Sequence, residues 1–307
     1  MPAAAPCADA PDVPDLPDAP EAAPRPRARN AAPSHGIAAS NLEALPAAPG
    51  VYEFLGDSPL PLYIGKSVNI RSRVLQHLRE PGEARMLAQS RQVVWHRTAG
   101  EIGALLLESR LIKTRQPLYN QRLRRSRELC SWQLPPDTAH TSAPAPTLVY
   151  SRDVDFAATD HLYGLFTSAH AARAFLKDLA LAQRLCQVCL GLEARSARGC
   201  FGLQLRQCDG VCVGREPVAA HTARLREALA QSQVQRWPFA GAVGLIERDG
   251  DWTQTHVVRH WRHEATLDNA AAPHAAPVST PQGFDLDAYR ILVKPLLAGQ
   301  IEIVPWP

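Results

Sequence analysis

Two phenols and a lysine lie close together near the start of the chain, and their types suit chemistry on a phosphate group. Tyr52 belongs to the run VYEFL and Tyr63 to PLYIG, two short apolar stretches typical of paired β-strands. Alternate residues on paired strands share one face of a sheet, so the two hydroxyls can flank one phosphate. Lys66 follows Tyr63 closely, and an ammonium beside a phenol lowers the pKa of that phenol. The segment therefore predicts a pair of tyrosines, one of which can accept a proton.

Basic residues follow the second tyrosine and open a predicted helix. Lys66, Arg71 and Arg73 precede the apolar turn VLQHL. Guanidinium groups bind phosphate oxygens through two parallel hydrogen bonds, which a lysine cannot do. We therefore expect Arg73 to neutralise charge that develops on a phosphoryl group.

Glu108 is the carboxylate of this set. It lies in the helical run ALLLESRLIK, which a capping box of Thr98 and Glu101 is predicted to open. Apolar residues three and four positions away share its face, so the carboxylate needs a partner. One interpretation is an ordinary ion pair with Lys113 or Arg115. The other is a ligand for Mg²⁺ or Mn²⁺, which bind one or two carboxylates together with waters and phosphate oxygens.

Four sequence blocks carry a family resemblance. They are LPAAPGVY, YIGKSVNIRSR, ALLLE and PLYN. Together they resemble the GIY-YIG nucleases, in particular the amino-terminal half of UvrC proteins, with Val51 in place of the usual isoleucine. The resemblance leaves open which tyrosine is the general base. It implies a small nuclease domain with six catalytic residues: Tyr52, Tyr63, Lys66, Arg73, Glu108 and Asn120.

The resemblance also implies a reaction and partners. UvrC proteins incise DNA in bacterial nucleotide excision repair, so we expect Mg²⁺-dependent hydrolysis of damaged duplex DNA on the 3′ side of a lesion presented by UvrA and UvrB. No motif of the RNase H-like or helix-hairpin-helix parts of UvrC is recognisable before Pro307, which indicates a short member of the family. Two alternatives stay open: a structure-specific GIY-YIG endonuclease that acts without UvrB, and a metal-cluster protein that binds DNA without cleaving it.

The charge distribution fits a nucleic-acid substrate. The net charge of the whole chain is only +3, but residues 61–127 contain fourteen Lys or Arg and four acidic residues, a balance of +10. Such a stretch suits a polyanion, and ordinary solvated surface charge is the alternative interpretation. Phosphate contacts position a protein without reading sequence, so recognition of DNA shape or of a preassembled complex is expected. Five arginines are the predicted phosphate contacts: Arg71, Arg79, Arg122, Arg124 and Arg125.

The first 39 residues have a different composition. Nine of the 27 prolines fall within residues 1–33, among many Ala and Asp and little that could be buried, so this tail is predicted to be disordered. It lacks the basic start and apolar core of a signal peptide. No stretch of the chain approaches the ~20 apolar residues that span a bilayer. The expected location is the cytoplasm, without a membrane partner.

Five of the seven cysteines form a second constellation, and in a cytoplasmic protein this density favours a metal site over disulfides. Four thiolates can hold either Zn²⁺ or an iron–sulfur cluster. The resemblance to UvrC implies a [4Fe–4S] cluster, with Zn²⁺ as the alternative. The implied ligands are Cys186, Cys200, Cys208 and Cys212, with Cys189 as the alternative fourth ligand.

The predicted fold class is α+β, in four regions. A disordered tail (1–39) precedes a GIY-YIG nuclease domain (40–127) with a short antiparallel sheet and flanking helices. A Cys-rich α+β region (128–215) and a carboxy-terminal α+β region of unknown role (216–307) follow.

Local signals predict several elements of the later regions. Ser168 is predicted to cap a helix, Asp249-Gly250 to turn a hairpin, and Phe284 to Leu297 to form a helix. Three histidines of the last region are interpreted as ordinary surface residues: His256, His260 and His263.

Overall fold

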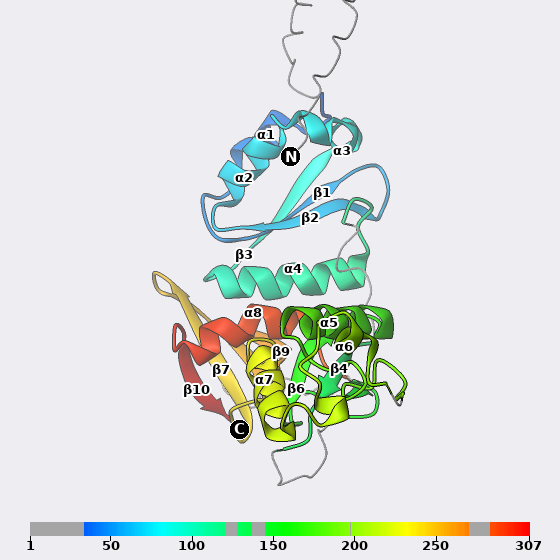
Figure 1. Cartoon of the computed structure of the whole chain (residues 1–307). Helices are drawn as coiled ribbons and strands as arrows, with labels where there is room; N and C mark the ends of the chain where they lie inside the picture. The colour runs from blue at the N-terminus through cyan, green and yellow to red at the C-terminus, as the bar shows by residue number, and fades with distance from the viewer. Residues whose placement is uncertain (1–33, 121–127, 137–144, 197, 270–282) are drawn as a thin grey trace, which may run out of the picture.

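The computed structural model of the chain describes residues 34–120, 128–136, 145–196, 198–269 and 283–307. Its elements stack in layers: short helices cover one face of a small sheet, the long helix α4 crosses the other face, and the middle and carboxy-terminal regions lie beyond α4 (Figure 1). The predicted α+β class is confirmed.

None of the described helices has both the length and the apolar character that crossing a membrane would require.

The amino-terminal layer is a three-stranded antiparallel sheet with strand order β2-β1-β3. Ile37, which the sequence places in the tail, is buried against this layer. The elements are α1 (Ala39–Glu43), β1 (Gly50–Leu55), β2 (Pro61–Ser67), α2 (Ile70–His77), the 3-10 turn η1 (Pro81–Glu83), α3 (Ala84–Gln89), β3 (Gln92–Arg97) and α4 (Glu101–Arg115).

The central strand β1 is buried on both faces because its residues alternate between two cores. Tyr52 packs in the cluster on the side of α2 and α3, whereas Val51 packs with Ile112 of α4. The fully buried carboxylate of Glu53 also pairs with α4, since Arg115 lies 2.7 Å from it. The strand therefore separates a tyrosine face from an α4 face.

Helix α4 is apolar on two sides and lies between the two halves of the molecule (Figure 1). Leu107 and Ile112 pack against the amino-terminal sheet. Ile102 and Leu106 belong to the core of the carboxy-terminal region. Because residues three or four apart share a helix face, Leu106 and Leu107 point in different directions, and one helix joins two hydrophobic cores.

The middle region packs a three-stranded antiparallel sheet, in the order β5-β4-β6, against helices α5 and α7. The Ser168 hydroxyl accepts the Ala171 N–H at 3.1 Å, which confirms the predicted helix cap. Leu225 and Leu229 of α7 belong to this core, although α7 begins after the predicted boundary at residue 215. The elements are β4 (Cys130–Gln133), β5 (Thr147–Tyr150), β6 (Leu162–Phe166), α5 (Ala169–Ala182), α6 (Phe201–Gln204), the 3-10 turn η2 (Val211–Val213) and α7 (Val218–Ala230).

The carboxy-terminal region is a four-stranded antiparallel sheet, in the order β10-β7-β8-β9, with α8 packed into the same core. Asp249 pairs with Trp252, so the predicted hairpin at this turn is confirmed. The predicted final helix is also confirmed, and Asp285 caps it. The elements are β7 (Ala242–Asp249), β8 (Trp252–Arg259), β9 (Arg262–Asp268), α8 (Leu286–Leu297) and β10 (Glu302–Trp306).

The start of α4 differs from the predicted capping box. Gly100 occupies the N-cap position and has no side chain to offer. The Thr98 hydroxyl donates instead to the Gly100 carbonyl at 2.7 Å, and Glu101 pairs with Lys66. The capping-box prediction is wrong because each of its two side chains has a different partner.

Leu106→Ala should destabilise the chain by about 2–5 kcal/mol, because it leaves a cavity in the core that joins α4 to the carboxy-terminal region. Leu106 is 3% exposed and the control residue Leu60 is 47% exposed, so Leu60→Ala should change stability by less than about 0.5 kcal/mol. Urea denaturation measures both. Equal stability of Leu106→Ala and wild type would contradict the bridging role of α4.

Candidate active site and four-cysteine centre

Tyr52 and Tyr63 lie together on the tyrosine face of the sheet, with ring centroids 6.3 Å apart. Tyr52 is paired in register with Gly65 of β2. A Cβ atom at residue 65 would lie 2.5 Å from the Tyr52 hydroxyl. Glycine is required there because the Tyr52 phenol passes across it, and the structure brings the two predicted tyrosines side by side.

A histidine that sequence reasoning missed completes this group. His77, in the last turn of α2, has its Nε2 atom 2.7 Å from the Tyr52 hydroxyl, and its Nδ1 atom contacts the Glu83 carboxylate. A carboxylate can only accept a hydrogen bond, so Nδ1 carries the proton and Nε2 accepts from Tyr52. His77 follows Arg73 by four residues, one helical turn, and that spacing is the sequence signal that could have identified it.

Burial controls the protonation of these groups. It raises the pKa of Tyr52 and of Tyr63, against the Arg73 guanidinium, which lowers both. Burial also lowers the pKa of His77, although the Glu83 carboxylate acts in the opposite direction. Near neutral pH the two phenols are protonated and the imidazole is neutral, so the Tyr52 proton has an acceptor in place.

Glu108 has no cation partner within the described part of the chain. The two cations of the ion-pair interpretation are engaged elsewhere: Lys113 lies 2.8 Å from Asp285 and Arg115 pairs with Glu53. That interpretation of Glu108 is therefore wrong.

The Glu108 carboxylate lies at the free edge of β2, close to the tyrosines. Its Oε1 atom accepts the Lys66 N–H at 3.0 Å, while Oε2 has no hydrogen bond to a described residue. Burial raises the pKa of Glu108, against the Lys66 N–H and ammonium, which lower it. The charge of Glu108 in turn raises the pKa of Tyr63. The carboxylate thus has one oxygen available and little compensation for its charge.

Lys66 was predicted to lower the pKa of a phenol, but in the structure Arg73 is the cation that does so. The Lys66 ammonium pairs with Glu101 at the start of α4, not with a phenol. Arg73 is the cation whose charge acts on both tyrosines. Its guanidinium donates to the Gln76 side chain at 2.7 Å and has no acidic partner among the described residues, so it is available to an anion.

Asn120 closes the edge of β2 next to Tyr63. Its Oδ1 atom accepts the Ile64 N–H at 2.9 Å, and its Nδ2 atom donates to the Ile64 carbonyl at 2.8 Å. An edge strand leaves such groups unpaired, and here one amide side chain pairs both. These bonds hold the loop that carries Asn120 against β2.

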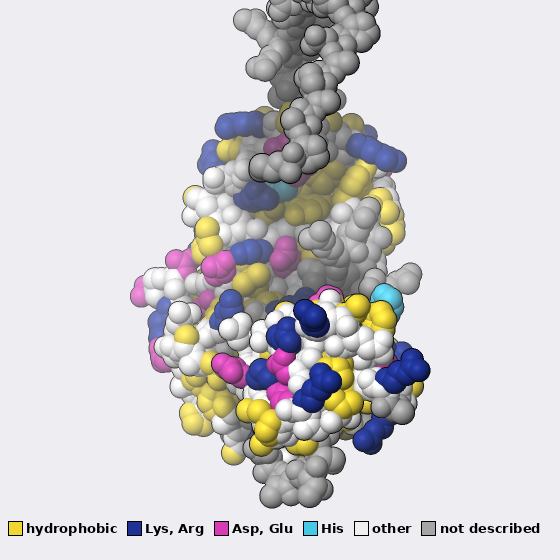
Figure 2. All heavy atoms as spheres, viewed as in Figure 1, with side chains coloured by type: hydrophobic (Ala, Val, Ile, Leu, Met, Phe, Trp, Pro, Cys, Tyr) yellow, Lys and Arg dark blue, Asp and Glu magenta, His cyan; other side chains and the backbone are white. Residues whose placement is uncertain are grey.

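Lys and Arg side chains lie on the upper part of the molecule, at the level of α2 and α3 (Figure 2). Arg71 and Arg79 are exposed and have no acidic partner within the residues that the structure describes. They are therefore free to contact phosphates. The other three predicted contacts lie outside the described residues: Arg122, Arg124 and Arg125.

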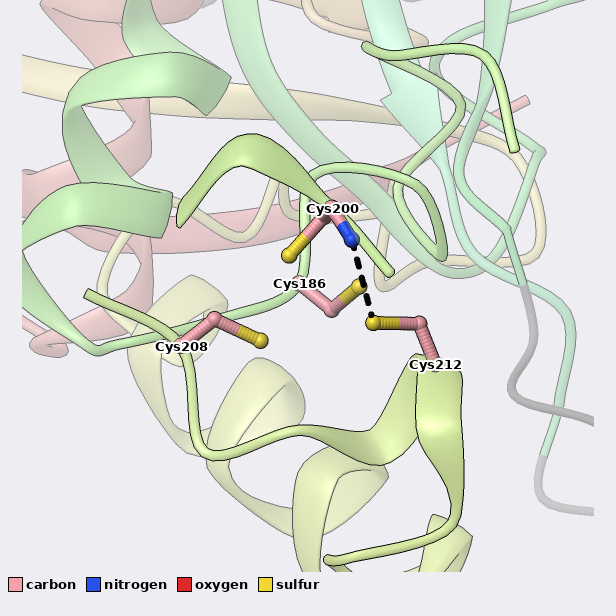
Figure 3. A group of neighbouring side chains, drawn as sticks. All are labelled: Cys186, Cys200, Cys208 and Cys212. Atoms are coloured by element: carbon pink, nitrogen blue, oxygen red, sulfur yellow. Dashed lines mark hydrogen bonds between the residues drawn. The ribbon is translucent and has the colours of Figure 1, made fainter. Parts of the chain in front are cut away.

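Four cysteines in the segment that follows α5 in the chain come together, and their sulfur atoms point toward one another (Figure 3). The four Sγ atoms all lie within 4.8 Å of one another. The set includes Cys186 and not Cys189. The geometry suits a metal ion or a cluster, and the members of the set are Cys186, Cys200, Cys208 and Cys212.

Backbone groups surround these sulfurs as they would surround bound thiolates. The Cys212 sulfur accepts the Cys200 N–H at 3.4 Å (Figure 3), and the Cys208 sulfur accepts the Gly210 N–H at 3.3 Å. Burial raises the pKa of the Cys200 and Cys208 thiols. Because metal ligands must be deprotonated, binding at this centre has to release protons.

Comparison with known proteins gives the family of the chain. Three family descriptions match it in order: UvrC-like GIY-YIG domain over residues 48–121, UvrC/Cho excinuclease middle domain over residues 135–231, and Excinuclease Cho C-terminal domain over residues 242–307. The excinuclease Cho of Escherichia coli (strain K12) is 49% identical over 266 residues, which are 86% of this chain and 88% of that protein. The chain belongs to the excinuclease Cho family. As a Cho protein it is a UvrC-like GIY-YIG endonuclease of nucleotide excision repair.

Other relatives extend the comparison of this Cho protein. The excinuclease Cho of Salmonella typhimurium (strain LT2) is 50% identical over 268 residues, 86% of this chain and 88% of that protein. The UvrABC system protein C of Cereibacter sphaeroides is 31% identical over 207 residues, 65% of this chain and 32% of that protein. The GIY-YIG amino-terminal endonuclease domain of UvrC from Thermotoga maritima, solved with magnesium, is 29% identical with a TM-score of 0.25, covering 26% of this chain and 92% of that chain.

Glu108→Gln should make the metal-free protein more stable at neutral pH, by up to a few degrees in Tm. The pKa of Glu108 is higher in the folded chain than in the unfolded chain. The free energy of unfolding of the wild type therefore decreases as the pH rises from the ordinary pKa of a glutamate to the raised pKa of the folded state. Glutamine keeps an oxygen for the Lys66 N–H and has no charge to bury. Thermal denaturation in EDTA, from acidic to neutral pH, checks this, and parallel curves for the two proteins would contradict it.

Cys208→Ser should lose the bound metal and much of its soluble yield, because it removes one of four converging ligands. Cys189→Ser is the matched control and should keep its metal, since Cys189 lies outside the set of four. Metal content of the purified proteins is measured by elemental analysis. Loss of metal from Cys189→Ser but not from Cys186→Ser would mean that Cys189, and not Cys186, is the fourth ligand.

Proposed function

We propose that this protein cuts damaged duplex DNA by Mg²⁺-dependent hydrolysis of one phosphodiester, 3′ of a lesion that UvrA and UvrB present in the cytoplasm. The observation that carries the proposal is Glu108, a largely buried carboxylate with one oxygen available and no cation partner in the described residues. Burying an unpaired carboxylate is unfavourable unless a cation binds it. Two tyrosines and an arginine that has no acidic partner among the described residues supply the other groups that phosphodiester hydrolysis requires.

The donor atoms around Glu108 fit a hard divalent cation. Mg²⁺ prefers oxygen and commonly takes one or two carboxylates, with waters and substrate phosphate oxygens at its other positions. The neighbouring carboxylates Glu83 and Glu101 are already engaged by His77 and Lys66, so Glu108 is the proposed protein ligand. When bound there, the ion would stabilise negative charge on the leaving 3′ oxygen.

The proton of the attacking water is proposed to move through Tyr52. A phenolate is unfavourable at this buried position, but the Tyr52 hydroxyl already donates to Nε2 of His77. Tyr52 can therefore take the water proton at its oxygen while its own proton passes to His77, and no phenolate accumulates. The Glu83 carboxylate on Nδ1 would stabilise the resulting imidazolium.

Arg73 and Tyr63 are proposed to hold the phosphate. The Arg73 guanidinium is exposed, unpaired with any described acid, and close enough to both tyrosines to lower the pKa of each. It can neutralise charge on the non-bridging oxygens, and the Tyr63 hydroxyl can donate a hydrogen bond to the same group. Lys66 and Asn120 would act through β2, which they fix against α4 and the following loop.

Exposed arginines in and just after α2 are proposed to contact the DNA backbone on either side of the cut. Arg71 and Arg79 lie outside the catalytic group and face solvent. Arg122, Arg124 and Arg125, which are outside the described residues, are proposed to contact phosphates as well. Contacts of this kind release counterions, so binding should weaken steeply as salt increases.

The four-cysteine centre is proposed to hold a [4Fe–4S] cluster, as the resemblance to UvrC implies. The separation of its sulfurs, all within 4.8 Å, suits a single tetrahedral Zn²⁺, for which Zn–S distances are about 2.3 Å, and a cluster with each sulfur on a different iron would need the sulfurs to move apart. Zinc is therefore the second candidate. A broad visible absorption band that bleaches on reduction would identify the cluster, and a colourless protein with one zinc per chain would identify the ion.

Glu108→Gln should abolish incision while leaving DNA binding intact, because it removes the metal ligand and little surface. The assay is Mg²⁺-dependent incision of a duplex with one bulky lesion, with and without UvrA, UvrB and ATP. The matched control is Glu80→Gln, an exposed glutamate between α2 and η1, which should cut like wild type. Cutting by Glu108→Gln at the wild-type rate would refute the metal assignment.

The same assay separates the two tyrosines and the competing functions. Tyr52→Phe should lose more activity than Tyr63→Phe, because only Tyr52 donates to His77, and the reverse order would overturn the proposed proton path. Incision of undamaged flaps or branches without UvrB would favour a structure-specific nuclease. Binding without incision under every condition would favour a protein that does not cleave.

A further inference from the structure

A carboxylate from the carboxy-terminal sheet binds the start of helix α4. Glu247 on β7 accepts the Ile102 N–H at 2.9 Å through Oε1 and the Gly103 N–H at 2.7 Å through Oε2. The side chain of Glu247 is 12% exposed. The first N–H groups of a helix have no partner within the helix, and a negative charge there is favoured by the helix dipole. A residue nearly 150 positions away thus does what a local N-cap side chain ordinarily does.

Two glycines make room for this contact. A Cβ atom at Gly100 would lie 2.2 Å from Oε1 of Glu247, and one at Gly103 would lie 2.7 Å from the His256 ring. Neither glycine has the positive φ that would require glycine for backbone reasons. The helix start is therefore shaped to receive the carboxylate and the imidazole behind it.

His256 fixes the orientation of Glu247. Its Nε2 atom lies 3.0 Å from the carboxylate and its Nδ1 atom 2.9 Å from the Thr266 hydroxyl. Because the carboxylate only accepts, Nε2 carries the proton and Nδ1 accepts from Thr266. The His256 side chain is 0% exposed, so its interpretation as an ordinary surface residue is wrong. Sequence periodicity could not identify it, because its partners come from β7 and β9.

Hydrogen bonds keep Glu247 ionised in this position. Burial alone would raise its pKa, but the bonds from His256, Gly103 and Ile102 outweigh burial and hold the pKa below its ordinary value. An anion is therefore present at the helix start at neutral pH.

Further contacts attach the same region to both ends of α4. The Gln254 side chain accepts the Ala99 N–H at 2.9 Å, just before the helix. Near the other end, Lys113 lies 2.8 Å from Asp285 and 2.9 Å from Asp287, both at the start of α8. The helix that carries Glu108 is thus held along its length by residues 242–307.

We infer that Glu247, oriented by His256, is a positioning residue for Glu108. The inference rests on the proposed role of Glu108 as metal ligand. Glu108 lies five residues after Gly103, about 7.5 Å along the same rigid helix, so a shift of the helix start moves its carboxylate relative to β2 and the tyrosines. Small displacements of a catalytic group are enough to slow a reaction strongly. The carboxy-terminal region would then be part of the catalytic apparatus without contacting DNA at the cut.

Glu247→Ala should slow incision of the lesion duplex on the order of tenfold or more, and should raise the Mg²⁺ concentration at half-maximal rate, while DNA binding stays unchanged. The measurement is single-turnover incision by the full chain with UvrA, UvrB and ATP over a Mg²⁺ series. Glu302→Ala is the matched control: it removes the Arg248 ion pair from the same sheet, is 49% exposed, and does not touch α4. It should incise like wild type.

A second variant separates positioning from simple capping. In Gly100→Ser/Glu247→Ala, the serine has space to cap α4 locally, so thermal stability should recover while incision stays slow. Recovery of both would mean that the carboxylate is only a cap, and would overturn the inference. If Glu247→Ala fails to fold, this variant decides alone: slow incision supports positioning and wild-type incision excludes it. Activity of Glu108→Gln would refute the metal assignment itself, so the two failures are distinguishable.

Discussion

Helix α4 has to satisfy two hydrophobic cores at once, and the rest of the structure depends on that constraint. Leu107 and Ile112 bind it to the amino-terminal sheet, and Ile102 and Leu106 bind it to the carboxy-terminal core. Ion pairs follow the same division: Arg115 pairs with Glu53 of β1, while Lys113 pairs with Asp285 at the start of α8. The helix has little freedom to rotate or slide without breaking contacts on one side. A carboxylate on such a helix is held in a defined place without a cation partner among the described residues.

The site works through groups whose charge is left uncompensated. Glu108 has one oxygen available, and Arg73 has no acidic partner among the described residues, although both lie near the buried Tyr52 or the half-buried Tyr63. The neighbouring Lys66 and Glu101 neutralise each other, which prevents either from pairing with these groups. Local pairing of the surrounding charges therefore preserves the anion and the cation that the substrate complex would use. Shifted pKa values cluster at active sites because catalytic groups need a pKa that suits their task.

Sequence reasoning succeeded where a property is local and failed where it depends on distant partners. The tyrosines and Glu108 were singled out from residue type and spacing, and Ser168 and the Asp249-Gly250 turn from local backbone chemistry. The density of cysteines indicated a metal centre, and the resemblance to UvrC supplied the four members that the structure brings together. His77 was missed because its spacing from Arg73 is a weak signal by itself, and its contact with Tyr52 exists only in the folded chain. The capping box at Thr98 was wrong because Glu247 occupies its place. No pattern around residue 100 could reveal a partner on a strand that follows nearly 150 residues later.

Side chains cover the free edge of β2, and this cover limits the association of one copy of the protein with another. An open sheet edge is a template to which another chain can add a strand. Here the Asn120 amide takes both backbone groups of Ile64, and the Glu108 carboxylate takes the N–H of Lys66. The side chains assigned to DNA cleavage thereby also close the edge at which two copies could join sheet to sheet. Asn120 and Glu108 therefore cover the strand edge in addition to the roles proposed for them at the site, and removing either side chain would expose part of that edge.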